Sequence, residues 1–165
     1  MPQNQTLTSE SASFAVSASG PELKFRHIQF ADPVPTGRQI AEAFGGHQPE
    51  DYAVLHWLTE GDIVQFGLDQ TIDLRANKNP RFIVAKSDRL FLFEIDDKQC
   101  AWPEPTITRD ALLIIAGQDP AKFTVWQDRR KEQDLEILAG HPANLAAEGT
   151  ERFYTVLDKT TEGEQ

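Results

Sequence analysis

Residues 90–102 read Leu90-Phe91-Leu92-Phe93-Glu94-Ile95-Asp96-Asp97-Lys98-Gln99-Cys100-Ala101-Trp102. Residues 90–95 are rich in aromatic and branched side chains, which favour strands. Asp96-Asp97-Lys98 supplies residues that favour a tight turn, and Gln99-Cys100-Ala101-Trp102 resumes the extended pattern. The stretch therefore predicts a β-hairpin. Pro103 and Pro105 end its second strand, because proline cannot donate a hydrogen bond to a neighbouring strand.

A helix is expected directly after this hairpin. Thr106 or Thr108 can cap its start, and Gly117 can end it in a left-handed conformation. Between the caps, three apolar residues follow helical spacing: Ala111, Leu112 and Ile115. Three β segments are predicted beyond the helix, over residues 123–126, 135–138 and 152–157.

The first half of the chain repeats this order. It predicts a hairpin of residues 13–16 and 23–28, a helix from about residue 38 to 44, and strands over 52–58, 63–66 and 81–85. An offset of 71 in the numbering superimposes the two halves without a gap; it places Arg38 on Arg109, Gly46 on Gly117, Val54 on Val125, Leu74 on Leu145, Arg81 on Arg152 and Phe82 on Phe153. Upstream, an offset of 70 aligns Pro33, Pro35 and Thr36 with Pro103, Pro105 and Thr106.

Two copies of a unit of about 70 residues therefore account for the body of the protein. The order strand-strand-helix-strand-strand suits a mixed sheet curled over one helix, which is the β-grasp arrangement. A ferredoxin-like unit would need a second helix, for which neither copy has space. Leu74 and Leu145 are expected to fill the two cores. The predicted fold class is α+β, with two tandem β-grasp domains.

Composition excludes several functional classes. The net charge of −10 argues against nucleic acid as a partner, because phosphate binding needs clustered Lys and Arg. Cys100 is the only cysteine, so no intramolecular disulfide forms, and we expect a buried, inert thiol. No apolar run approaches the roughly 20 residues that span a membrane, and the polar start lacks a signal peptide, which favours a cytoplasmic protein.

Catalytic and metal sites are not expected. The four histidines lack metal-ligand spacing, and no nucleophile lies in a pattern with a base and an orienting group, so the chain is not predicted to be an enzyme. The aspartate pairs are expected in turns and at solvated edges. The tryptophans are expected to pack in the core or between the units, although any of them could anchor a partner: Trp57, Trp102 and Trp126.

Several short motifs, in order, resemble the bacterial multiubiquitin family over residues 13–163. In the first copy these are Thr36-Gly37-Arg38-Gln39-Ile40, a glycine and a proline, Asp73-Leu74 and Arg81-Phe82. Their second-copy counterparts are Arg109, Gly117, Pro120, Asn144-Leu145 and Arg152-Phe153. The closing Thr160-Thr161-Glu162-Gly163 is similar to the usual tail of that family.

The resemblance implies a tandem ubiquitin-like protein modifier, and with it a domain plan. A disordered N-terminal tail, residues 1–11, would precede the first ubiquitin-like domain, residues 12–87. The second domain, residues 88–158, would lead into a flexible conjugation tail, residues 159–165. The chain itself would need no cofactor, because ATP and zinc belong to its partner enzymes.

Family likeness also implies the partners. These are a ubiquitin-activating-like enzyme, a ubiquitin-conjugating-like enzyme and a JAB-type metallopeptidase. The modifier would be attached to target proteins, with a phage structural protein among the candidates, as part of bacterial defence against phage.

Gly163 is the expected point of conjugation. A terminal carboxylate must pass through a narrow enzyme channel, and glycine is unhindered and conformationally free. The channel would hold Lys159, Thr160, Thr161 and Glu162, and the six residues from Leu157 to Gly163 can span roughly 20 Å. Glu164 and Gln165 follow the glycine, so the resemblance implies that the peptidase cuts between Gly163 and Glu164.

The junction between the copies contains no glycine, so we expect the units to stay joined: it reads Ala85-Lys86-Ser87-Asp88-Arg89. Two alternatives remain open. One is a β-grasp adaptor that binds partners through its sheet faces and is never conjugated. The other is a sulfur carrier, although such carriers are usually single units that end in two glycines.

Overall fold

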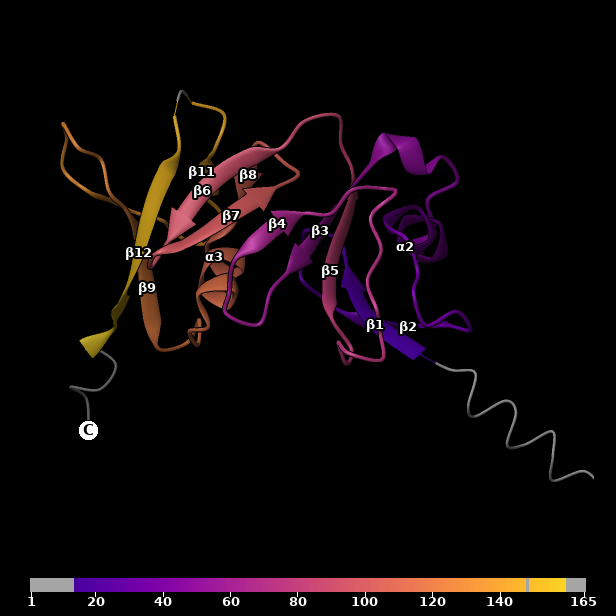
Figure 1. The fold of residues 1–165 in the computed structure, drawn as a ribbon. Helices are drawn as coiled ribbons and strands as arrows, with labels where there is room; N and C mark the ends of the chain where they lie inside the picture. Colours follow the sequence, from indigo (N-terminus) through magenta and orange to yellow (C-terminus); the bar gives the residue numbers. More distant parts are fainter. Residues whose placement is uncertain (1–13, 148, 160–165) are drawn as a thin grey trace, which may run out of the picture. The chain divides into compact units, whose positions relative to one another are not determined.

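The computed structural model describes residues 14–147 and 149–159, which form two units (Figure 1). Within this part of the chain, unit 1 contains residues 14–58 and 65–88, and unit 2 contains residues 59–64 and 89–159. Each unit is a mixed sheet with one α-helix, in the order predicted from the sequence. The prediction of an α+β protein with tandem β-grasp domains is confirmed.

Unit 1 begins with a hairpin of β1 (Phe14–Ser19) and β2 (Arg26–Phe30). Helix α2 (Gly37–Phe44) and the 3₁₀ turn η1 (Pro49–Asp51) follow. Strands β3 (Tyr52–Trp57) and β5 (Arg81–Lys86) complete the sheet in the order β3-β5-β1-β2, with β1 and β5 parallel. The first hairpin strand continues to Ser19, past its predicted end at residue 16, and the second starts at Arg26 instead of residue 23, so the loop covers residues 20–25 rather than 17–22.

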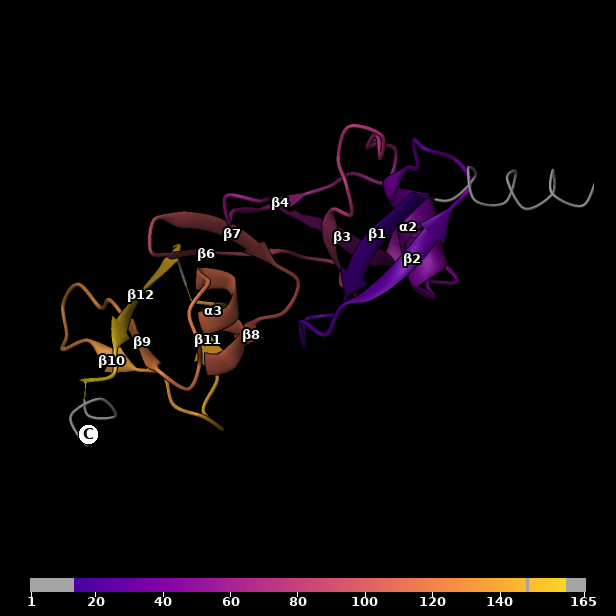
Figure 2. The same ribbon diagram turned by 90° about the horizontal axis from the view of Figure 1, so that it is seen from below.

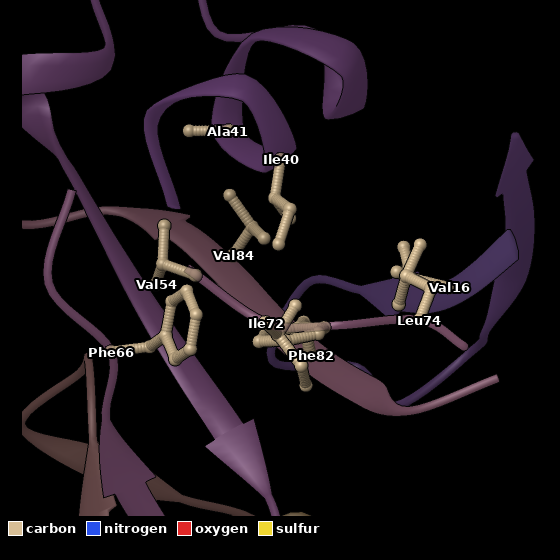
Figure 3. Packing of buried hydrophobic residues seen from close by; sticks show 9 residues of the cluster. All are labelled: Val16, Ile40, Ala41, Val54, Phe66, Ile72, Leu74, Phe82 and Val84. Carbon is tan, nitrogen blue, oxygen red and sulfur yellow. The ribbon is translucent and has the colours of Figure 1, made fainter. Parts of the chain in front are cut away.

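The core of unit 1 lies between helix α2 and the sheet (Figure 3). Ile40 extends from the helix toward Val84, as Figure 3 shows, and Ala41 and Val54 belong to the same buried cluster. The remaining buried members of this cluster are Val16, Phe66, Ile72, Leu74 and Phe82. Leu74 is thus a core residue, as predicted.

Unit 2 repeats the plan with β6 (Phe91–Ile95), β7 (Lys98–Trp102), helix α3 (Arg109–Ala116), β9 (Phe123–Gln127), β10 (Leu135–Glu136) and β12 (Glu151–Leu157). Its sheet has the order β10-β9-β12-β6-β7. A short second ladder, which the sequence did not predict, joins β8 (Thr106–Ile107) to β11 (Ala143–Asn144). Leu145 follows this ladder and is buried, as predicted.

In unit 2, the hairpin turn and both ends of helix α3 form at residues that the sequence predicts. Asp96 and Asp97 form the hairpin turn with positive φ angles of 47° and 70°, which Asp tolerates better than most residues. Thr108, not Thr106, caps α3 by accepting a hydrogen bond from the Ala111 N–H. Gly117 ends the helix with a left-handed φ of 80°.

The ends of the two helices show that the predicted alignment of the copies is shifted by one residue in this region. Thr36 caps α2 as Thr108 caps α3, and Gly45 ends α2 as Gly117 ends α3, which is an offset of 72 in the numbering. In the strands that follow the helices, the offset is 71. There the Phe66 N–H donates to the Val54 carbonyl, and 71 residues later the Ile137 N–H donates to the Val125 carbonyl. The first copy therefore has one additional residue at Gly45-Gly46, so the gap-free alignment was wrong there.

One consequence is that Arg38 and Arg109 are not counterparts. Arg109 is the first residue of its helix and donates hydrogen bonds to the carbonyls of Pro120 and Phe123. Arg38 is the second residue of its helix and forms ion pairs with Glu50 at 2.6 Å and Asp69 at 3.5 Å.

The proline alignment changes as well. Leu74 N–H bonds to the Pro33 carbonyl and Leu145 N–H to the Pro105 carbonyl, each at 2.7 Å. Pro33 thus corresponds to Pro105, again an offset of 72, and the offset of 70 predicted from the sequence was wrong.

Strand β4 (Ile63–Gln65) has an unexpected partner. Its sequence belongs to the first copy, but it pairs in parallel with β7, with Ile63 opposite Cys100 (Figure 2). Residues 59–64 accordingly belong to unit 2. They cover the edge of β7, which would otherwise expose unpaired backbone groups.

Candidate functional site

The predicted site residues, 159–164, follow β12 in the sequence. Lys159 is the last residue that the structure describes, directly after Asp158. The other predicted site residues lie outside the described part of the chain: Thr160, Thr161, Glu162, Gly163 and Glu164. The structure does describe β12 and Asp158, which precede the predicted tail, and it shows how this last strand is held.

β12 is held differently along its length. Its first three residues pair in parallel with β6, and Phe153 packs its ring against Phe93 with 6.0 Å between the ring centres. From Phe153 to Leu157 the strand pairs antiparallel with β9. Because β6 ends at Ile95, the second half of β12 needs another partner on that side.

Asp96 supplies this partner from the hairpin turn. One carboxylate oxygen accepts a hydrogen bond from the Thr155 N–H at 3.0 Å, and the other accepts from the Thr155 hydroxyl at 2.6 Å. The Asp96 N–H in turn donates to the Phe153 carbonyl. Unit 1 has Val84 at the position of Thr155, and valine has no hydroxyl with which to form the second of these bonds.

The structured body ends in the same way in both copies. Asp158 N–H bonds to the Lys122 carbonyl at 2.8 Å, and Ser87 N–H bonds to the Asp51 carbonyl at 3.0 Å. Both donors and both acceptors are related by the offset of 71. After Ser87 the chain continues into the second copy. After Asp158 it continues into the predicted conjugation tail.

Tyr154 is anchored beside this strand. Its hydroxyl donates a hydrogen bond of 2.6 Å to the Asp134 carboxylate. That bond, together with burial and the negative charges of Asp134 and Asp128, raises the pKa of Tyr154 to about 12 from an ordinary value of 10.0. The neutral phenol is therefore the form that the folded chain favours.

We expect alkaline pH to break the Tyr154 anchor. Because the pKa of Tyr154 is higher in the folded than in the unfolded chain, its stabilisation is complete below about pH 10 and is lost as the pH rises through about 12. The chain has two tyrosines, so the difference in phenolate absorbance between wild type and Tyr154→Phe isolates this group. A Tyr154 that ionises at its ordinary pH would contradict the prediction.

The bonds between Asp96 and Thr155 give a second prediction. Thr155→Val keeps the side-chain shape but removes a hydrogen bond to a charged acceptor, which costs about 1–2 kcal/mol of unfolding free energy. Hydrogen exchange of the Val156 and Leu157 amides should become faster. Asp96→Asn is the matched control, because an amide can accept from the backbone N–H, donate to the hydroxyl and tolerate a positive φ. Unchanged exchange in Thr155→Val would show that these bonds do not hold the strand.

The outer face of the unit 2 sheet carries exposed apolar side chains. The pairing register places Leu92 of β6 and Val156 of β12 on the face opposite the buried Phe93 and Phe153. Leu92 is 57% exposed and Val156 42% exposed.

Other candidates have structural roles. Cys100 is buried, as predicted, and burial raises the pKa of its thiol to about 12. Trp102 is buried and donates to the Thr106 carbonyl. Among residues 14–147 and 149–159, no group of three or more His, Cys, Asp or Glu could hold a metal ion. In the same residues, no helix is long and apolar enough to cross a membrane.

Sequence reasoning missed Asp96 as a strand anchor. Asp96 was expected only as a turn residue with a solvated carboxylate, and the turn is confirmed. Its bonding partner lies 59 residues further along the chain, so no local pattern could identify it. The one available signal was a threonine in the last strand where the first copy has Val84.

Comparison with known proteins agrees with this architecture. A family model described as Multiubiquitin matches residues 22–87 and again residues 91–158. The two matches correspond to the two copies and together cover most of the chain. A comparison with curated proteins gives no match.

Proposed function

Because this chain belongs to the multiubiquitin family and is a ubiquitin-like protein, we propose that it is a protein modifier conjugated to targets through Gly163. One observation carries the proposal: both copies close with the same backbone bond, and only the second is followed by the tail with its glycine. Gly163 is the fifth residue after Asp158, so the chain can reach about 17 Å beyond the body when extended.

Processing is the first proposed step. A JAB-type zinc metallopeptidase activates a water molecule, which attacks the Gly163 carbonyl and breaks its bond to the Glu164 nitrogen. The hydroxyl remains on the new Gly163 carboxyl group, and the proton goes to the amine of the departing Glu164-Gln165 dipeptide. Processing is required because an internal glycine has no free carboxylate.

Activation and transfer follow. A ubiquitin-activating-like enzyme joins the Gly163 carboxylate to the AMP part of ATP, and pyrophosphate leaves. A cysteine thiolate then displaces AMP to form a thioester, and a ubiquitin-conjugating-like enzyme passes the modifier to a target. Glycine suits each step, because the attacked carbonyl has no side chain beside it.

The setting is proposed from the family likeness stated above. The modifier acts in the bacterial cytoplasm in defence against phage, and a phage structural protein is one candidate target. The two copies remain joined throughout, because the junction from Ala85 to Arg89 contains no glycine.

Intact mass spectrometry tests the proposal. Incubation with the peptidase should remove Glu164-Gln165 only, and ATP should then support an adduct with the activating enzyme. Omission of ATP is the control for activation. A processed chain that forms no adduct would contradict conjugation, and an unprocessed chain would contradict the role of the peptidase.

The second candidate is an adaptor that is never conjugated. The exposed Leu92 and Val156 on one face of unit 2 favour it, because apolar groups on a sheet face can bind a partner. An unchanged mass with retained partner binding would support the adaptor. Loss of binding in a Leu92→Ser, Val156→Ser double variant would then locate the surface.

A further inference from the structure

The sequence before the proposed cleavage point occurs a second time. Thr161-Glu162-Gly163 is followed by the acidic Glu164, and Thr59-Glu60-Gly61 is followed by the acidic Asp62. Nowhere else does the chain contain Thr-Glu-Gly, and the remaining Glu-Gly pair, at residues 148–149, is preceded by Ala147. A peptidase that recognises Thr-Glu-Gly before an acidic residue therefore meets two matching sequences in one chain.

The first of these sequences is built into unit 2. Ile63 lies opposite Cys100 of β7 and is only 1% exposed. The Asp62 carboxylate accepts a hydrogen bond from the Gln99 N–H at 3.3 Å. Both contacts lie on the carboxyl side of the Gly61–Asp62 bond, so that side cannot leave β7 without breaking them.

Gly61 itself is buried and has the wrong conformation for cleavage. Its φ of +115° belongs to a turn, whereas a peptidase holds its substrate extended. The Lys98 side chain packs across it so closely that a Cβ at this position would collide with the lysine Cδ and Cε. Cleavage after Gly61 therefore requires this buried turn to open and the backbone to become extended.

The turn explains only part of this repeated sequence. A φ of +115° requires glycine at position 61. Thr59 and Glu60 are exposed, so the turn does not demand these residue types. The likeness to the tail thus exceeds what the local fold requires.

We propose that Gly61–Asp62 is a second cleavage site for the processing peptidase, and that its pairing with β7 protects it. This inference rests on the proposed function. Cleavage there would be the same hydrolysis as at the tail: water breaks the amide bond, the hydroxyl stays on Gly61 and the proton goes to the Asp62 amine. The product would carry a second reactive carboxylate on Thr-Glu-Gly, so protection keeps the modifier intact with a single reactive end.

Two peptides of equal length test whether the sequence is cleavable. Residues 55–67 contain the internal sequence and residues 153–165 contain the tail. The residue after the glycine is Asp in the internal peptide and Glu in the tail peptide, and the two differ by one methylene. An enzyme that distinguishes substrates by one methylene does so about 10–200-fold, so the internal peptide should be cut at a rate within about 200-fold of that of the tail peptide. In the full chain, cutting at Gly61 should be at least about 100-fold slower than in the peptide, since only locally opened molecules are cut.

A matched pair of full-chain variants tests the protection. Ile63→Ser removes the buried contact with β7 and should increase cutting at Gly61 at least about tenfold. Val64→Ser makes a similar change at the neighbouring position, which is 40% exposed, and should leave the rate unchanged. Mass spectrometry distinguishes a break after Gly61 from loss of Glu164-Gln165.

Each outcome separates the two proposals. If the tail peptide is cut and the internal peptide is not, the second site is wrong and the proposed function stands. If the wild-type chain is cut at Gly61 as fast as the peptide, pairing with β7 does not protect it. If neither peptide is cut, the processing step fails, and the second site fails with it. The peptides decide the sequence question even if Ile63→Ser does not fold.

Discussion

Gly163→Leu is expected to abolish conjugation and to leave the unfolding free energy within about 0.5 kcal/mol of the wild type. Gly163 lies beyond the last described bond of the body, so its replacement removes no described core contact. A branched side chain beside the carbonyl hinders hydrolysis, adenylation and thioester formation at the same atom. Mass spectrometry of the peptidase reaction and a gel assay for ATP-dependent adducts measure the two losses.

Two further chains separate processing from activation. A chain that ends at Gly163 should form the adduct without the peptidase, whereas the same shortened chain with the Gly163→Leu substitution should not. Gln165→Leu is the matched control, because it adds the same side chain to the dipeptide that processing removes. Conjugates formed by Gly163→Leu at the wild-type rate would assign the reacting carboxylate to another residue.

Phe82→Ala is expected to be the most destabilising single truncation in unit 1. Phe82 is 0% exposed, and its ring packs against both His56 and Phe66, with ring centres 4.8 Å and 5.1 Å away. Removing a buried phenyl ring costs about 3–5 kcal/mol, because apolar contact is lost and a cavity remains. That loss is a large fraction of the stability of a domain of this size.

Denaturant unfolding measures this effect as a lower midpoint. Leu92→Ala is the control, because the leucine is 57% exposed and its truncation should change the unfolding free energy by less than about 1 kcal/mol. A loss of less than about 1 kcal/mol for Phe82→Ala would show that the core can close around the missing ring.

The predicted elements were confirmed where their signals are local. Thr36 and Thr108 cap the helices through bonds to a residue three positions away, and Gly45 and Gly117 end them. Asp96 and Asp97 form the predicted hairpin turn. Such features depend on a few neighbouring residues, so a single sequence contains them.

The alignment of the copies shows where sequence comparison failed. Matching Arg38 to Arg109 and Gly46 to Gly117 maximised identity without a gap, but it ignored the caps. The helices differ by one position from the strands that follow, because Gly45-Gly46 in the first copy corresponds to Gly117 alone. A helix boundary is defined by hydrogen bonds, and equal residue types at a nearby position do not preserve them.

The sequence by itself determined that the chain contains two β-grasp copies with a single glycine-bearing tail. Helix caps and hydrophobic periodicity depend only on neighbouring residues, and the repeat is recognised from many matched positions taken together. The tertiary structure alone decided that residues 59–64 join β7 and that Asp96 holds Thr155. Asp62 and Gln99 are 37 residues apart, and Asp96 and Thr155 are 59 apart. Contacts over such separations depend on how the whole sheet closes, which local preference cannot specify.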